Sequence, residues 1–308
     1  MTETDFSRRS FFATASAFAA LSLAGTADAK PHKKKKAQHV NTSLLGNWAM
    51  GVQLWTVNAQ MKADIPGTLK ALKGTGFDVI ETAGLYDGTA TALKSQLQDA
   101  GLGCRSCHVN MGALLDNLDM HIANTHALGA SWLVCSSPKT PGPIDQTKPW
   151  VQAMGETMTL DAYKQNADYI AMLAPKVTSA GLKFAYHNHP MEFADLGGGV
   201  TGYELFAQSS DLLRLEMDLG WVFAAGLDPV AMLHKYAGRV DLLHVKDMVK
   251  DANGYRSVEI GRGMIDWKTT LKAAHDTKVS GFFVEQEEPY LKPIFESLQD
   301  SVGYLRKL

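Results

Sequence analysis

Short apolar runs alternate with longer stretches of helical periodicity along most of this chain. A short apolar run bounded by polar residues or glycine is typical of a buried strand, and apolar positions that recur every three to four residues are typical of an amphipathic helix. We expect strands at residues 50–55, 79–82, 103–109, 132–136, 183–188, 213–218, 240–245 and 282–286. We expect helices at residues 65–73, 91–100, 114–128, 160–179, 203–209, 229–236, 267–277 and 289–308. Gly76, Gly101 and Gly181 lie between a predicted helix and the next strand, where glycine commonly ends a helix.

These strand–helix repeats predict a single parallel barrel. A TIM barrel, a closed ring of eight parallel strands with helices outside, has about 250 residues. The competing fold is an open doubly wound sheet, but no glycine-rich phosphate-binding motif follows any predicted strand. The longest connection, residues 138–159, carries four prolines and is expected to border the mouth, either as a substrate lid or as a passive loop. We therefore predict an α/β protein with one (β/α)8 TIM barrel over residues 46–308.

Composition and charge limit the partners of this domain. With 45% hydrophobic and 20% charged residues, the 308-residue chain is typical of a globular protein with a sizeable core. A formal net charge of −2 predicts no general attraction to nucleic acid or anionic membranes, and we interpret the lysine run at residues 33–36 as a solvated linker. Cys104 and Cys107 are three apart on a predicted strand and face opposite sides, so we expect them and Cys135 to be buried thiols.

The first 29 residues resemble an export signal. Residues 7–12 read S-R-R-S-F-F, an apolar stretch of small residues covers 13–24, and an A-D-A triplet occupies 27–29. A charged start, a short apolar core and an A-x-A end describe a secretory signal peptide, and the arginine pair is typical of the twin-arginine type. The apolar stretch is shorter than the roughly 20 residues that span a membrane. We predict export of the folded chain by the twin-arginine machinery to the periplasm, cleavage after Ala29, a basic polar linker over 30–45, and no stable membrane span afterwards.

Polar residues two apart end four of the predicted strands in the second half of the chain. The pairs are His187 and His189, Glu216 and Asp218, His244 and Lys246, and Glu285 and Glu287. Residues i and i+2 of a strand point to the same side, and in a TIM barrel the carboxyl ends of the strands build the active site. Because unpaired buried charge is costly, converging carboxylates and imidazoles indicate a metal ion with oxygen and nitrogen ligands.

Individual residues receive roles on this basis. Asp218, His244 and Glu285 are each favoured as ligands, and one of His187, His189 and Glu192 is expected to complete the shell. Two roles are compatible with Lys246, namely stabilising a developing oxyanion or pairing with Asp247 or Glu285. A polar pocket with an aromatic wall, as carbohydrate sites often have, is expected from Gln53, Trp55, Glu81, His108 and Asn110 at the ends of the first three strands, with Trp221 and Glu287 also assigned to substrate binding.

Several motifs together resemble one known family. They are G-V-Q-L-W, Y-H-N-H-P-M-E-F, M-D-L-G-W, G-R-V-D-L-L-H-V-K-D, I-G-R-G-M-I-D-W and F-F-V-E-Q-E. In this combination the chain, from about residue 50 to its end, resembles the sugar phosphate isomerase/epimerase family of xylose isomerase-like TIM barrels. The resemblance implies one divalent metal ion (Mn, Zn, Co or Mg) held by Glu, Asp, His and Glu. Asp218, His244 and Glu285 match the last three ligands, whereas His187 stands where many relatives have glutamate and Trp221 where many have histidine.

The resemblance and the site residues together predict an enzyme acting on a sugar or keto-sugar. We expect the metal to polarise a carbonyl and Glu285 or Glu192 to move a proton on the adjacent carbon, with assistance from His189 or Lys246. Returning the proton gives isomerisation or epimerisation, and loss of a β-substituent gives a lyase, for example one that cleaves a keto-glycoside. The absence of a phosphate-binding motif favours unphosphorylated substrates. The alternatives are a periplasmic sugar-binding protein without catalysis and, less favoured because the chain lacks a basic surface and extra histidines, an apurinic endonuclease.

Overall fold

Eight parallel strands close into a barrel. The computed structural model describes residues 43–252 and 254–308. The barrel strands are β1 (Gly51–Gln53), β2 (Val79–Thr82), β3 (Gly103–Val109), β4 (Trp132–Cys135), β5 (Lys183–His187), β6 (Leu213–Asp218), β7 (Val240–Val245) and β10 (Gly281–Val284). They pair in the order β1-β10-β7-β6-β5-β4-β3-β2, and β1 also pairs with β2, which closes the ring. The predicted TIM barrel is confirmed, whereas the predicted export signal and most of the predicted linker lie outside the described residues.

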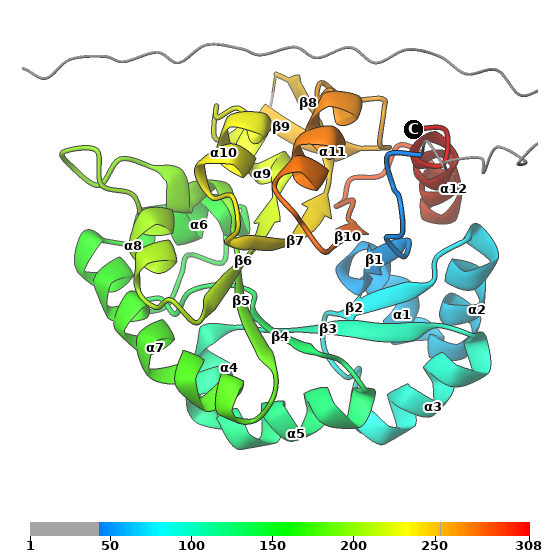
Figure 1. Cartoon of the computed structure of the whole chain (residues 1–308), viewed down its shortest axis with the longest axis horizontal. Helices are drawn as coiled ribbons and strands as arrows, with labels where there is room; N and C mark the ends of the chain where they lie inside the picture. The colour runs from blue at the N-terminus through cyan, green and yellow to red at the C-terminus, as the bar shows by residue number, and fades with distance from the viewer. Residues whose placement is uncertain (1–42, 253) are drawn as a thin grey trace, which may run out of the picture. The chain divides into compact units, whose positions relative to one another are not determined.

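Helices surround the barrel strands (Figure 1). They are α1 (Asn58–Ala63), α2 (Ile65–Thr75), α3 (Ala90–Ala100), α4 (Met111–Asp116), α5 (Leu118–Leu128), α6 (Trp150–Thr157), α7 (Leu160–Ser179), α8 (Gly202–Gln208), α9 (Leu219–Ala224), α10 (Pro229–Lys235), α11 (Trp267–Asp276) and α12 (Ile294–Leu305). Side chains of Thr89 and Thr159 cap the N-termini of α3 and α7 by accepting hydrogen bonds from backbone N–H groups. Gly76 and Gly101 end α2 and α3 with φ of 110° and 73°, a conformation that favours glycine.

Two predicted elements differ from those observed because of local side-chain hydrogen bonds. The first strand ends at Gln53, whose side chain accepts a hydrogen bond of 2.9 Å from Trp55 N and turns the chain into the 3-10 helix η1 (Leu54–Val57). Trp55 therefore lies in a turn rather than at a strand end. The predicted helix 114–128 is divided at Asn117, whose side chain caps α5.

The sequence pattern missed a β-hairpin after β7. Strands β8 (Asp247–Asp251) and β9 (Gly254–Val258) pair antiparallel. Buried Asp247 anchors the chain that follows, since its carboxylate accepts hydrogen bonds from the backbone N–H groups of Gly261 (2.8 Å) and Gly263 (2.9 Å). A Cβ at Gly263 would lie 2.1 Å from Asp247 Oδ1, which explains the second glycine of the I-G-R-G motif.

Alternation along the strands divides the barrel interior into an apolar and a polar part. A small buried cluster of Trp132, Val134, Ala185, Leu242 and Phe283 is separate from the main core. Two residues further along three of the same strands come His187, His244 and Glu285. Because residues two apart share a face, these polar side chains lie directly beyond the apolar cluster. The apolar plug closes one end of the barrel and leaves the carboxyl ends of the strands to carry polar chemistry.

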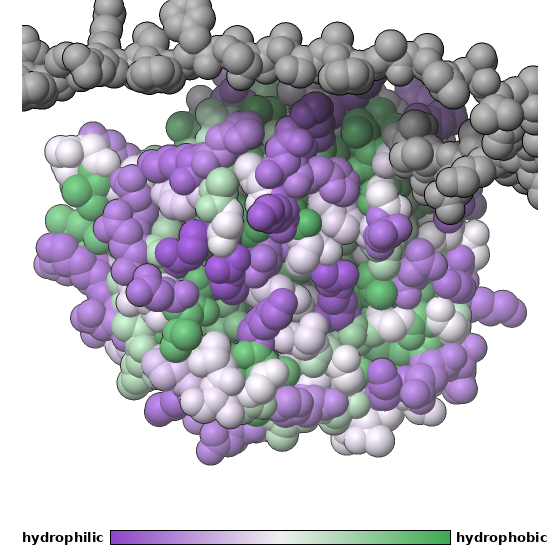
Figure 2. Space-filling view, in the orientation of Figure 1, coloured by the Kyte–Doolittle hydropathy of each residue, from purple (hydrophilic) through white to green (hydrophobic). Residues whose placement is uncertain are grey.

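The described surface has the character of a globular domain. On the face drawn in Figure 2, hydrophilic residues cover much of the surface with smaller hydrophobic areas between them. Within the described ranges, no helix is both long and apolar enough to cross a bilayer. Cys104, Cys107 and Cys135 are all free and buried, as expected.

Candidate functional site

Four neighbouring strands deliver the predicted ligand residues to one point. Register pairs His187 on β5 with Glu216 on β6, and Asp218 on β6 with His244 on β7. Glu285 follows β10, whose residue Phe283 pairs with His244. All five polar side chains are buried. The structure thus brings together side chains that are up to 98 positions apart (187 and 285) in the sequence.

The predicted set His187, Asp218, His244 and Glu285 has the geometry of a metal centre. One nitrogen or oxygen atom of each lies within 4.8 Å of the others. His244 Nδ1 lies 2.6 Å from Glu285 Oε2 and 3.8 Å from Asp218 Oδ2. His187 Nδ1 is buried without a hydrogen-bond partner and lies 3.6 Å from Glu216 Oε2, and a second set, His108, His187, Glu216 and His244, also has one nitrogen or oxygen atom of each within 4.8 Å of the others. Two imidazoles and two carboxylates suit Zn²⁺, Mn²⁺ or Co²⁺, so the residues present fit a divalent cation.

The electrostatics of two of these side chains agree with a cation site. Burial raises the pKa of Asp218 to about 6, although Lys246 opposes the shift, so its charged form needs further compensation. Burial and the neighbouring cationic groups lower the pKa of His187 well below its usual range. His187 is therefore neutral at pH 7, which is the form that binds a metal.

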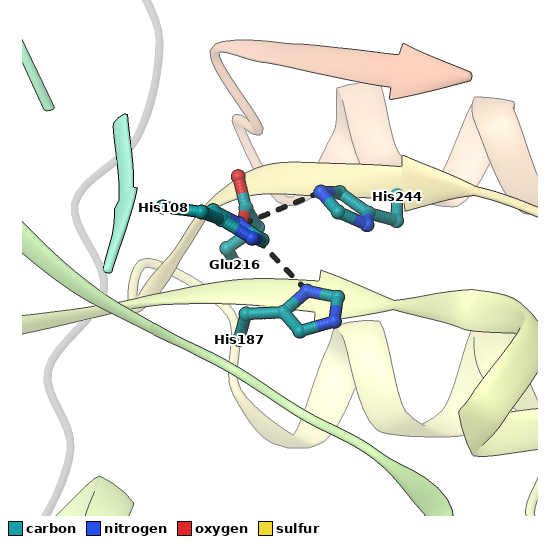
Figure 3. Close-up of side chains that lie close together, drawn as sticks. All are labelled: His108, His187, Glu216 and His244. Atoms are coloured by element: carbon teal, nitrogen blue, oxygen red, sulfur yellow. Dashed lines mark hydrogen bonds and ion pairs between the residues drawn. The ribbon is translucent and has the colours of Figure 1, made fainter. Parts of the chain in front are cut away.

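A second layer of polar side chains contacts His187 and His244 (Figure 3). His108 from β3 points toward Glu216, and their Nε2 and Oε2 atoms are 2.5 Å apart. Glu81 from β2 accepts from His244 Nε2 at 2.7 Å and lies 2.9 Å from His108 Nε2. Gln53 from β1 donates to the same Glu81 oxygen at 2.7 Å. His244 is therefore held between Glu81 on one ring nitrogen and the ligand carboxylates on the other, the usual way in which a second carboxylate orients a metal-binding histidine.

The buried carboxylates of the two layers attract positive charge. Within the described cluster the buried carboxylates are Glu81, Glu216, Asp218 and Glu285. Burial opposes a charge on His108, but Glu81 and Glu216 outweigh it and raise the pKa of His108 to about 9. Buried Lys246 supplies a second positive charge. Burial lowers the pKa of His244, but Glu285 and Glu216 outweigh it and hold the pKa well above its usual range, so the site attracts a positive charge that a bound divalent cation would supply in place of the His244 proton.

Lys246 is locked beside the ligands by three carboxylates. Its Nζ lies 2.9 Å from Asp218, 3.1 Å from Glu285 and 2.6 Å from Glu287, and 4.4 Å from the centre of the Trp221 ring. Burial lowers the pKa of Lys246, but these carboxylates outweigh it and hold the pKa above its usual range. Of the two pairing partners considered from sequence, Glu285 is confirmed. The carboxylate of Asp247 instead binds backbone N–H groups.

His189 and Glu192 have different surroundings although both follow β5. His189 lines the cavity described below, and its ring meets the edge of Trp150 at a centroid distance of 4.7 Å. Glu192 lies in the 3-10 helix η2 (Pro190–Phe193), fully buried, and accepts hydrogen bonds from the Tyr186 hydroxyl (2.8 Å) and His189 N (2.6 Å). Burial raises the pKa of Glu192 to about 8. Glu192 does not line the cavity, so it holds the loop of His189 rather than facing a ligand.

A large cavity opens over the polar cluster. It has a volume of about 1210 Å³ and is lined by the predicted residues Gln53, Trp55, His108, His187, His189, Trp221, Glu285 and Glu287. Glu81 lies beneath this surface, fully buried. The predicted mouth connection does border the cavity through Pro149 and Trp150, although it contains the helix α6 rather than only loop. Sequence reasoning did not single out Trp150, or Tyr255 on the unpredicted hairpin, because neither lies near the end of a predicted strand.

The match to a family model decides the relationship. The model described as "Xylose isomerase-like TIM barrel" matches residues 69–308. The chain belongs to this family.

Two curated relatives match part of this chain at low sequence identity. An inosose dehydratase from Clostridium beijerinckii is 24% identical over 169 residues, which cover 48% of this chain and 55% of the relative. An inosose dehydratase from Lacticaseibacillus casei is 24% identical over 186 residues, covering 53% and 59%. The chain thus spans less than two thirds of these relatives.

Several solved structures share the fold over most of the chain. A sugar phosphate isomerase/epimerase from Parabacteroides distasonis has a TM-score of 0.67 and 24% identity, covering 84% of this chain and 93% of that one. A xylose isomerase-like TIM barrel protein from Mycobacterium smegmatis, solved in complex with magnesium, has a TM-score of 0.61 and 14% identity, covering 86% and 97%. The IOLI protein with a bound zinc atom has a TM-score of 0.59 and 16% identity, covering 83% and 95%. The family resemblance inferred from the motifs is confirmed.

Proposed function

We propose that this protein is a divalent-metal-dependent enzyme that moves a proton on the carbon next to a carbonyl group of a sugar or keto-sugar. One observation carries the proposal: two imidazoles and two carboxylates converge, buried, at the floor of a large cavity. Membership of a family whose solved members include sugar isomerases and epimerases supports a carbohydrate substrate.

The proposed ligands are His187, Asp218, His244 and Glu285. A divalent cation bound there would polarise a carbonyl oxygen and stabilise the negative charge that develops on it. Lys246, fixed beside Asp218 and Glu285, would place a second positive charge at the same end of the cavity. Its ammonium group is held by three carboxylates, so it would act as a cation and not as a base.

His189 is the proposed proton acceptor. It lines the cavity, and burial lowers the pKa of His189 to about 3, so its ring is neutral at pH 7 and can accept a proton, whereas Glu285, which also lines the cavity, is engaged by His244 and Lys246. Glu192 holds the backbone of His189 in place through the 2.6 Å hydrogen bond to its N–H group. Glu285 would serve as a ligand, with Trp221 forming an apolar wall over Lys246.

An unphosphorylated substrate fits the cavity best. Among the described residues that line it, none is lysine or arginine, the side chains that usually bind phosphate. The nearby charge of Lys246 is already matched by Asp218, Glu285 and Glu287. We also propose, from the arginine pair and the A-D-A triplet alone, that the mature protein works in the periplasm after twin-arginine export.

Elimination is the second candidate, and the names of the curated relatives, inosose dehydratases, favour it. After His189 takes the proton, the electron pair of the broken C–H bond would form a carbon–carbon double bond. The C–O bond to the substituent on the next carbon would break, and the departing oxygen would keep that electron pair and take up a proton. Isomerisation and elimination share the first step, so one site supports both.

Metal content and proton exchange test the proposal together. Mature protein purified without chelator should contain about one divalent ion per chain by mass spectrometry, and Asp218→Ala should lose it. Asp168→Ala, an exposed aspartate on α7, is the matched control and should keep the ion. Keto-sugars incubated with the loaded enzyme in D₂O should gain deuterium next to the carbonyl by NMR, and loss of a substituent would identify elimination. Protein that stays metal-free after reloading with manganese and zinc would refute the proposal and favour a sugar-binding protein.

A further inference from the structure

The mouth of the cavity has exposed apolar side chains, whereas its floor has buried polar ones. Trp55, Met120 and Trp150 line the mouth and are 53%, 45% and 41% exposed, among the few large hydrophobic side chains of the described chain that face solvent. They come from three separate elements, η1, α5 and the start of α6. Convergence of exposed apolar side chains on one cavity usually marks a binding surface rather than chance exposure.

The two ends of the cavity are continuous. Trp150 at the mouth contacts the ring of His189, which lies next to the His187 ring at a centroid distance of 4.9 Å. The cavity volume of about 1210 Å³ also exceeds the roughly 300–1,000 Å³ of sites that enclose a drug-sized molecule. A single sugar ring at the polar floor would therefore leave the mouth unfilled.

The side chains that line the mouth indicate which kind of group would bind there. Besides the three large side chains, Leu85 and Pro149 add apolar surface, and the neutral polar side chains His121 and Asn124 line the cavity next to Met120 on α5. Tryptophan rings pack well against other aromatic rings, and the flexible thioether of methionine makes favourable contacts with them. An aromatic ring would cover Trp55, Met120 and Trp150 without removing hydroxyl groups from water, whereas a second sugar would bury part of its hydroxyl groups against these side chains.

We propose that the mouth is a subsite for an aromatic aglycone, so that the substrate is an aryl glycoside or its keto derivative with the sugar ring at the polar floor. This inference rests on the proposed function for the position of the sugar ring. It identifies the departing substituent of the elimination reaction as the group held by Trp55, Met120 and Trp150.

Binding measurements with matched glycosides test the subsite without requiring chemistry. By isothermal titration calorimetry, phenyl β-glucoside should bind the mature protein about 10-fold more tightly than methyl β-glucoside. Trp150→Ala and Met120→Ala should each lower the phenyl-to-methyl affinity ratio by about 3-fold or more. Met172→Ala is the matched control, since Met172 on α7 is 46% exposed but does not line the cavity, and it should leave the ratio unchanged.

Several results of these measurements would contradict the proposed aromatic subsite. Equal affinities for the two glucosides, no saturable binding of phenyl β-glucoside, ratios unchanged in both variants, or tighter binding of cellobiose than of phenyl β-glucoside would all contradict it. The result is separable from the proposed function. A phenyl preference in a protein that needs no metal and exchanges no proton keeps the subsite and removes the chemistry, whereas metal-dependent exchange without a phenyl preference does the reverse.

Discussion

Replacing Glu81 by glutamine tests whether the deeper polar layer organises the metal site. Glu81 touches no cavity space, but one of its oxygens accepts from His244 Nε2 at 2.7 Å and from Gln53 Nε2 at 2.7 Å. The first bond holds the His244 ring so that Nδ1 faces Asp218 and Glu285. Glutamine preserves the size of the side chain and can offer one carbonyl oxygen, but it removes the negative charge.

The size of the effect follows from the bond that is weakened. A hydrogen bond to a charged group contributes about 1.5–3 kcal/mol, compared with about 1 kcal/mol for a neutral one. Loss of a carboxylate that orients a metal-binding histidine typically lowers metal affinity about 10–100-fold, or roughly 1.4–2.8 kcal/mol. Glu81→Gln should therefore weaken zinc binding by about that factor while leaving one ion per chain at saturation.

Competition with a chromophoric chelator measures this affinity directly. Glu204→Gln is the matched control, because Glu204 also pairs with a cation, Lys235 at 2.8 Å, but on the surface. The control should bind zinc as wild type does. If Glu81→Gln melts at the wild-type temperature and binds zinc within about 2-fold of wild type, then Glu81 does not orient His244 and the two-layer description is wrong.

Three further predictions concern stability. Glu192 holds its proton in the folded state up to about pH 8 but only to about pH 4.5 when unfolded, so wild-type stability should fall as pH rises between these values, by up to about 1.4 kcal/mol per pH unit. The free energy of unfolding in urea, plotted against pH, should fall less steeply for Glu192→Gln than for wild type. The exposed-site control Glu296→Gln should follow wild type. Equal pH dependence in all three proteins would contradict the raised pKa of Glu192. Gly220→Ala should destabilise by about 1–3 kcal/mol, because a Cβ there would lie 2.7 Å from the Lys246 carbonyl oxygen, and an unchanged melting temperature would show that the helix shifts freely. Phe206→Ala should destabilise by about 3–5 kcal/mol, since its fully buried ring packs between two tyrosines, and a loss below 1 kcal/mol in urea unfolding would contradict this packing.

Local patterns in the sequence were sufficient for the barrel and for the residues that point into it. Alternation on β5 and β7 places His187 and His244 on the inward face whatever the surroundings, because side chains two apart on a strand share a side. The glycines at 76 and 101 end their helices in the left-handed conformation that glycine adopts most easily. Size and the repeat of strand and helix then leave few folds other than a TIM barrel.

The hydrophobic pattern did not predict element boundaries where a single side chain redirects the backbone. Gln53 and Asn117 each cap a new turn with a side-chain hydrogen bond, which shortens one strand and divides one helix. The chain after the hairpin β8–β9 is held by the carboxylate of Asp247, which binds backbone groups 14 and 16 positions away. Apolar periodicity carries no information about such contacts.

The sequence by itself determined the fold, the family and the side chains that face the polar end of the barrel. Only the tertiary structure decided which of those side chains contact one another and which of them line the cavity. It joined Glu81 to His244 across 163 positions and His108 to Glu216 across 108, turned Glu192 away from the cavity, and brought Trp150 to its mouth. The physical reason is that strand direction is a local property of the backbone, whereas which strand ends meet, and at what distance, is fixed only when the ring of eight strands closes.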